Sequence, residues 1–143
     1  MEALKSDPPA FGSAFEEETV FTEDEWKRRI QNTLFAMSDG APIGMIACLF
    51  NDRPKTKRIA DIVGFYVSAS HRGQGVGTKM LERALSVIRS KKRIVKVKPA
   101  VNPEQRAAVR LYRRTGFVVT GRTKKELKVG PRFYEMLFME KHL

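Results

Sequence analysis

Strand-like and helix-like segments alternate along the chain in an order that predicts a mixed α/β fold. Apolar residues at helical spacing predict helices at about 22–32, 78–89 and 102–116. Runs rich in apolar, β-branched and aromatic residues predict strands at about 34–37, 43–50, 58–67, 94–98, 117–120 and 133–139. The central order of strand, helix, strand, helix has helices long enough to cross over, which favours one parallel strand pair within the sheet.

Local signals refine several of these boundaries. Thr22 predicts a helix N-cap, with Glu25 as its capping-box partner. Asn102 predicts a second N-cap, followed by Pro103 in the first helical position and Gln105 as the capping-box partner. Residues 58–67 are nearly all apolar after Asp61, which predicts a strand buried on both faces.

Length and composition indicate one globular domain spanning residues 1–143, with 42% hydrophobic and 30% charged residues. Apolar runs all fall short of the roughly 20 residues that a membrane span needs. The single cysteine, Cys48, excludes an intrachain disulfide and fits a reducing compartment, so a cytoplasmic location is expected. Because Cys48 lies in an apolar strand, we expect it in the core rather than at a reacting centre. No metal site is expected.

Charge is unevenly distributed, although the net charge is +11. Residues 1–25 hold eight acidic and one basic side chain, whereas the remainder holds 26 basic and eight acidic ones. The basic part includes an expected loop around Lys124 and Lys125 between the last two strands. A basic body fits a nucleic acid or a small polyanion such as a nucleotide cofactor. Aromatic residues do not interleave the basic runs and no nucleic-acid module is recognisable, so a nucleic-acid partner is not expected.

Residues 72–77, with the sequence Arg-Gly-Gln-Gly-Val-Gly, carry the strongest chemical signal. They follow a predicted strand and open a predicted helix. Three glycines allow backbone N–H groups to approach an anion closely, and the helix N-terminus adds further donors. A Walker loop would need Lys followed by Ser or Thr after the last glycine, but Thr78 and Lys79 stand in the reverse order. A dinucleotide fingerprint would need a different glycine spacing. The pattern therefore predicts either another kind of pyrophosphate site or a glycine turn that only joins the strand to the helix.

The stretch 67–77 resembles the acetyl-CoA-binding motif of the GCN5-related N-acetyltransferases, Arg/Gln-x-x-Gly-x-Gly/Ala after a central strand. Residues 107–117 resemble a second family motif, an Ala-x-x-Leu-Tyr helix followed by Gly-Phe. The resemblance implies a mixed, mostly antiparallel sheet with a parallel pair splayed at the cofactor site and helices on its faces. Such proteins usually begin with a strand before the first helix. That strand is expected to be missing here, leaving a sheet edge that a homodimer could cover.

The resemblance also implies roles for individual residues. The backbone of Phe65, Tyr66 and Val67 would orient the pantetheine arm of acetyl-CoA. The pyrophosphate would be held by Arg72, Gly73, Gln74, Gly75, Val76, Gly77 and Thr78. Gln105 stands where the family commonly has an asparagine that contacts the pantetheine. Tyr112 is the candidate general acid, and Asp61 a candidate base; a base acting through water, or no dedicated base, stays open.

The implied activity is direct acetyl transfer from acetyl-CoA to a primary amine of a small molecule or peptide. The acidic residues 16–18 would favour a cationic acceptor such as a polyamine, an aminoglycoside or a peptide N-terminus, or they are simply solvated surface acids. Two alternatives remain: an acyltransferase using another acyl-CoA, and a non-catalytic domain that binds acyl-CoA and regulates.

Overall fold

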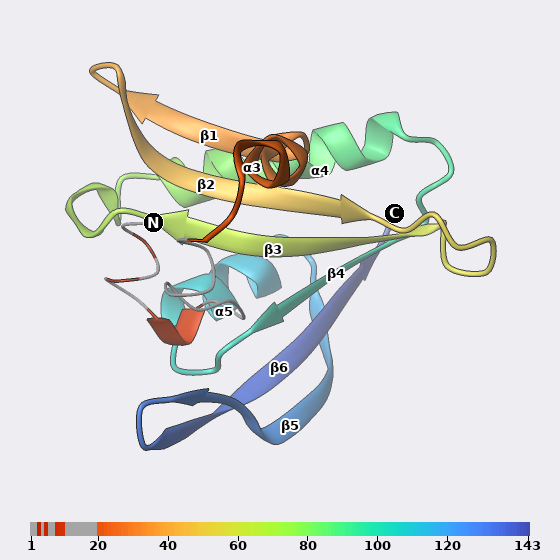
Figure 1. Ribbon diagram of the computed structural model, residues 1–143. Helices are drawn as coiled ribbons and strands as arrows, with labels where there is room; N and C mark the ends of the chain where they lie inside the picture. The colour runs from red at the N-terminus through yellow and green to blue at the C-terminus, as the bar shows by residue number, and fades with distance from the viewer. Residues whose placement is uncertain (1–2, 4, 6–7, 11–19) are drawn as a thin grey trace.

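The computed structural model describes residues 3, 5, 8–10 and 20–143 (Figure 1). The described elements are η1 (Pro8–Ala10), α3 (Glu23–Ile30), β1 (Thr33–Ser38), β2 (Ala41–Phe50), β3 (Ile59–Val67), η2 (Ala69–His71), α4 (Val76–Ser90), β4 (Lys96–Val101), α5 (Arg106–Arg114), β5 (Val118–Val129) and β6 (Arg132–His142). Among these residues, no helix is long and apolar enough to cross a membrane.

The strands form one six-stranded sheet in the order β1-β2-β3-β4-β6-β5. Only β3 and β4 run parallel, and every other pair is antiparallel. The predicted mixed, mostly antiparallel sheet with one parallel pair is therefore confirmed. No strand precedes β1 in the part of the chain that the structure describes, so β1 and β5 are the edges.

The parallel pairing is short, and this shortness opens the sheet. It runs from Ile59 opposite Lys96 to Ile62 opposite Pro99. Beyond these residues, β3 and β4 both continue but no longer pair with each other. Pro99 has no backbone N–H to donate, which weakens the ladder at that point. Gly64 adopts a positive φ of 59°, which helps β3 turn away. Figure 1 shows the two strands separating toward their carboxyl ends.

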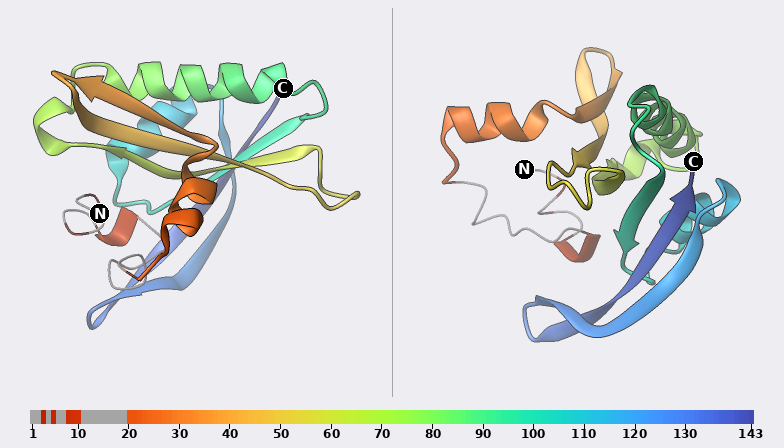
Figure 2. Two further views of the ribbon diagram at one scale, coloured as in Figure 1. Left: turned by 45° about the horizontal axis from the view of Figure 1, so that its top comes forward. Right: turned by 90° about the vertical axis from the view of Figure 1, so that its right-hand side faces the viewer.

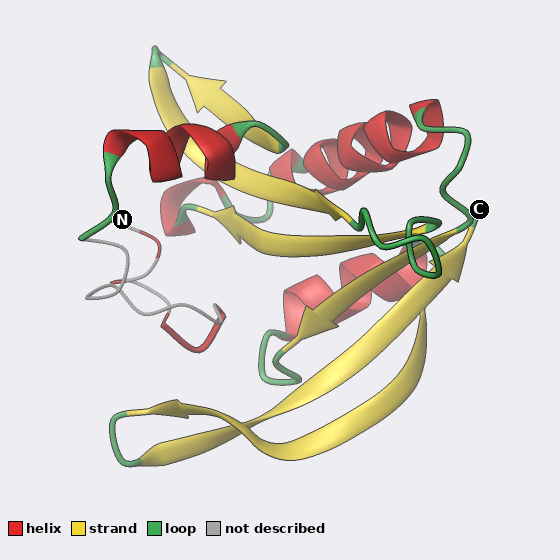
Figure 3. Cartoon of the chain, turned by 45° about the vertical axis from the view of Figure 1, so that its right-hand side comes forward, coloured by secondary structure: helices red, strands yellow, loops and turns green. Residues whose placement is uncertain are grey.

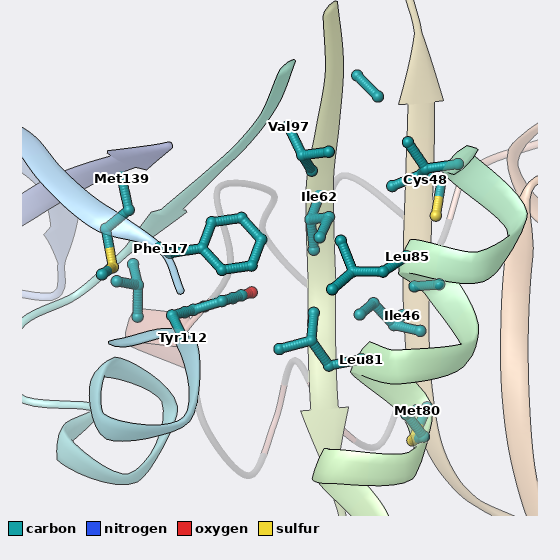
Figure 4. Packing of buried hydrophobic residues seen from close by; sticks show 14 of the residues in the cluster. Ile46, Cys48, Ile62, Met80, Leu81, Leu85, Val97, Tyr112, Phe117 and Met139 are labelled. Atoms are coloured by element: carbon teal, nitrogen blue, oxygen red, sulfur yellow. The ribbon is translucent and has the colours of Figure 1, made fainter. Parts of the chain in front are cut away.

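Helices cover both faces of the sheet (Figure 2). Helix α3 and η1 lie on one face, and α4 and α5 lie on the other. Five apolar residues of α4 are buried at the predicted helical spacing: Met80, Leu81, Ala84, Leu85 and Ile88. They pack on β2 and β3 in the cluster of Figure 4, and burying each large aliphatic side chain contributes about 1.5–3 kcal/mol.

The edge strand β1 exposes two large apolar side chains. Phe35 is 47% exposed and Met37 57% exposed. At the opposite edge, β5 and β6 form a long hairpin that projects past the end of β4 (Figure 3). The hairpin turns at Gly130, which has a φ of 56°.

Several predicted boundaries were wrong. Asn102 does not cap a helix, because α5 begins only at Arg106; its Oδ1 instead accepts the Glu104 N–H at 2.9 Å and closes a short turn. Gln105 is the residue before α5 and makes no side-chain cap. The capping box of Thr22 and Glu25 is confirmed by hydrogen bonds in both directions.

Further differences concern the strands. Lys124 and Lys125 lie inside β5 rather than in a loop, where Lys125 takes a φ of 54° at an irregularity in the pairing. Strand β4 begins at Lys96 and extends to Val101, later than the alternating residues 94–98 predict. Strand β3 is not buried on both faces, because Val63 is 40% exposed beside the opening of the sheet.

Candidate active site

A cleft of about 420 Å³ occupies the opening between β3 and β4. Its walls come from the second half of β3, the loop before α4, the end of β4 and helix α5. Most of the predicted site residues meet here: Phe65, Tyr66, Val67, Arg72, Gly73, Gly75, Gly77, Thr78, Gln105 and Tyr112 all line the cleft. Three predicted residues, Asp61, Gln74 and Val76, are not part of the lining.

The loop before α4 has the conformation that its glycines permit. Gly73 and Gly75 have φ values of 73° and 82°, and no atom lies within 4 Å of where a Cβ would stand. Residues with a Cβ rarely adopt this backbone, so the glycines determine the path of the loop. Gly75 is the N-cap of α4, which begins two residues earlier than predicted. The first N–H groups of a helix lack intrahelical partners, so this end of the cleft suits an anion.

Side-chain hydrogen bonds fix the loop. Arg72 donates from Nε to the Val67 carbonyl at 2.8 Å, and its guanidinium lies 5.6 Å from the ring of Tyr66. Gln74 donates to the Ser70 carbonyl at 3.0 Å, which explains why its side chain turns back on the loop instead of lining the cleft. His71 also lines the cleft, with Nδ1 at 2.8 Å from the Ser68 hydroxyl, although the sequence favoured no role for it.

Tyr112 lies at the inner end of the cleft and is only 3% exposed. Its ring packs edge-on against Phe65 and Phe117, with centroids 6.0 and 5.3 Å away. Burial, together with the nearby Cys48, raises the pKa of the Tyr112 phenol well above its ordinary value. The hydroxyl has no hydrogen-bond partner among the described residues, and it points toward β3 and Ile62 in Figure 4. A phenol so held stays protonated near neutral pH and can serve as a proton donor, but not as a general base.

Asp61 does not join this group. It lies on β3 opposite Lys98, within the paired part of the parallel ladder and before the strands separate. Its Oδ2 accepts a hydrogen bond from Asn51 at 3.3 Å. The structure therefore does not bring the candidate base to the cleft. Cys48 is 1% exposed on β2, and burial raises the pKa of its thiol to about 11, which fits the expected core role.

Helix α5 contributes lining residues that the sequence prediction missed: Ala107, Ala108, Arg110, Leu111 and Arg114. Arg114 donates to the Thr78 hydroxyl at 3.2 Å and so ties α5 to the first turn of α4. Arg110 and Arg114 stand four residues apart on one helix face, a spacing that could have identified them. Together with Arg72 they give the lining of the cleft a positive charge. The acidic residues 16–18 lie outside the described residues.

Known acetyltransferases are similar to this chain in sequence and in fold. Over 81 residues the chain is 30% identical to an uncharacterized N-acetyltransferase of Methanocaldococcus jannaschii, covering 55% of this chain and 35% of that relative. The chain thus spans about a third of that protein's length.

Two solved structures share the fold. An acetyltransferase of the GNAT family from Streptococcus pneumoniae has a TM-score of 0.84 at 21% identity, covering 99% of this chain and 89% of that one. The putative acetyltransferase yncA from Salmonella typhimurium, solved with its cofactor acetyl-CoA, has a TM-score of 0.81 at 20% identity, covering 98% and 82%. The sequence model of the acetyltransferase (GNAT) family matches residues 1–117, and the chain belongs to this family.

Proposed function

We propose that the protein transfers the acetyl group of acetyl-CoA directly to a primary amine of a small molecule or peptide. The observation that carries this proposal is the meeting of both motifs in one cleft. The glycine loop of residues 72–78 forms one end, and Tyr112 on α5 lies at the other, where β3 and β4 separate. The family assignment supports acyl transfer as the reaction class.

The residues of the cleft suit acetyl-CoA. The backbone of Phe65–Val67 is released from pairing with β4 and can hydrogen-bond an extended pantetheine arm. The N-terminus of α4 and the open space at Gly73 and Gly75 suit a pyrophosphate. Gln105 lines the cleft beside Tyr112 and offers an amide to the same arm.

In the proposed step, the amine nitrogen attacks the thioester carbonyl carbon. The new C–N bond replaces the C–S bond, the electron pair of that bond passes to sulfur, and Tyr112 delivers a proton to the departing thiolate. The proton lost by the amine restores the phenol, either directly or through water. We assign no residue as general base, because Asp61 lies outside the cleft lining.

A turnover screen tests this function. The purified protein is incubated with acetyl-CoA and panels of amines, amino acids and peptides, and free CoA thiol is detected with a chromogenic disulfide. The buried Cys48 should contribute little background to this assay. Acetyl-CoA that stabilises the protein against heat without any turnover would support the non-catalytic alternative. Faster turnover with a longer acyl-CoA would support the other acyltransferase reading. If the protein bound neither acetyl-CoA nor the longer acyl-CoA, the proposal would be refuted.

Reaction in the cytoplasm is part of this proposal. The single free cysteine fits a reducing compartment, and the supply of acetyl-CoA there would serve the reaction.

A further inference from the structure

A second cleft, of about 490 Å³, lies on the other side of the β4–α5 connection. It is bounded by that connection and by the hairpin of β5 and β6, and its lining is mostly polar. Asn102 belongs to the lining of both clefts, so the two clefts adjoin at this residue. A molecule in the second cleft would therefore lie next to the cleft between β3 and β4, just after the end of β4.

The amide of Asn102 is unusual because it is buried and incompletely bonded. The side chain is only 3% exposed. Its Oδ1 accepts the Glu104 N–H, which fixes the orientation of the amide because a backbone N–H can only donate. Its Nδ2 reaches only the Pro9 carbonyl, at 3.5 Å. One N–H of a buried amide is thus left without a partner among the described residues, and such groups normally find an acceptor.

In the second cleft, each carboxylate is paired with an arginine, and one further arginine has no carboxylate partner among the described residues. Glu135 is held by the Nε of Arg122 at 2.6 Å, and Glu104 is paired with Arg132 across to the hairpin. Arg106, at the start of α5, has no carboxylate partner within the described part of the chain. Its guanidinium is the unbalanced charge of the cleft, and guanidinium groups bind carboxylates through paired hydrogen bonds.

We infer that the second cleft binds the acceptor, and that the acceptor is a small primary amine carrying a carboxylate, as a free amino acid does. Arg106 binds the carboxylate, and the unpaired N–H of Asn102 donates to the acceptor where the clefts meet. This inference rests on the proposed function. It also opposes a polyamine acceptor, because the chain carries a net charge of +11 and would repel a polycation.

Matched acceptors test the inference. Each amino acid is compared with its own amide, which keeps the amine and side chain but lacks the carboxylate. We expect kcat/KM for the acid to exceed that for the amide by about tenfold or more, as for a charge-assisted hydrogen bond. Arg106→Gln should remove this preference. Arg113→Gln is the matched control, since Arg113 is exposed on the same helix and lines neither cleft.

Asn102→Asp tests the meeting point of the two clefts. The variant keeps the oxygen that accepts the Glu104 N–H, so the turn should persist, but it replaces the donor by a carboxylate. We expect kcat/KM for the amino acid to fall about tenfold or more. Because the carboxylate is buried and loses the Nδ2 bond to the Pro9 carbonyl, the thermal midpoint should also fall, so rates are compared at a temperature at which both proteins are folded. The inference would be overturned if acids and amides reacted at equal rates, or if Arg106→Gln kept the wild-type preference for the acid. It would also be overturned if polyamines were better acceptors than amino acids.

Calorimetry separates this inference from the proposed function. Amino acids and their amides are titrated into the protein saturated with CoA. Tighter binding of the acid that Arg106→Gln abolishes would support the subsite even if no amine were acetylated. Absence of binding in this titration, together with active acetylation of amines that lack a carboxylate, would retain the proposed function and refute the subsite.

Discussion

Replacement of Tyr112 by Phe should separate catalysis from folding. The ring contacts with Phe65 and Phe117, at 6.0 and 5.3 Å, are retained in Phe. The lost hydroxyl has no hydrogen-bond partner among the described residues, and burying such a group costs about 1–3 kcal/mol. Because the phenol also lines a cleft that water can enter, we expect the free energy of unfolding to stay unchanged or rise by about 1 kcal/mol at most. Tyr112→Ala, in contrast, should lose about 3–5 kcal/mol.

Turnover, unlike stability, should fall sharply in Tyr112→Phe. Loss of a positioned general acid lowers rates by about 10²–10⁴-fold, equivalent to about 3–5 kcal/mol of transition-state stabilisation. Acetyl-CoA affinity should change little, since the interaction forms only as the thiolate departs. The measurements are steady-state thiol release, calorimetric titration with acetyl-CoA and urea unfolding, all on wild type and Tyr112→Phe.

The pH profile provides an independent check. Because burial raises the pKa of Tyr112 above its ordinary value of 10.0, the phenol keeps its proton as pH rises toward 10. The wild-type rate should therefore rise with deprotonation of the amine and show no falling limb near neutral pH. Unchanged turnover in Tyr112→Phe would refute the general-acid role. A loss of turnover accompanied by weaker acetyl-CoA binding and lower stability would instead indicate a packing role.

The remaining predictions concern the core, one turn and the sheet edge. Burial raises the pKa of Cys48 from 9.0 to about 11, so its thiol should react with a chromogenic disulfide only after unfolding, and rapid labelling of the folded protein would contradict its burial. The stability linked to that proton is complete below pH 9.0 and is lost as pH rises through about 11, so the urea midpoint should fall over this range, and less so in Cys48→Ala. Leu81→Ala, at a site with 0% exposure, should lose about 2–5 kcal/mol by urea unfolding. In Gly116→Ala, the free energy of unfolding should fall by about 1–2 kcal/mol because Gly116 has a φ of 92°. An unchanged urea midpoint would show that the backbone of this turn relaxes. Homodimerisation through the β1 edge predicts a dimeric mass by light scattering, and a monomeric mass would exclude it.

Local sequence patterns determined much of the fold. The spacing of apolar residues in α4 follows from the helical repeat, so its buried face was predictable residue by residue. The glycine loop was equally predictable, because glycine tolerates the positive φ that Gly73 and Gly75 adopt and other residues rarely do. The predicted ends of helices and strands were less accurate. At Asn102, a side-chain bond to the Glu104 N–H competed with helix capping and delayed α5 to Arg106.

Long-range placement lay beyond the sequence patterns. Asp61 and Tyr112 are both plausible catalytic residues by type, but only the pairing of β3 with β4 up to Ile62 and Pro99 keeps Asp61 within the ladder and places the cleft beyond it. The spacing of Arg110 and Arg114 places them on one face of α5, but only the packing of α5 against the open sheet brings that face to the cleft between β3 and β4. The sequence thus determined the conformation of the glycine loop, because that depends on local backbone freedom. The tertiary structure decided which charged groups face it, because that depends on contacts between segments far apart in the chain.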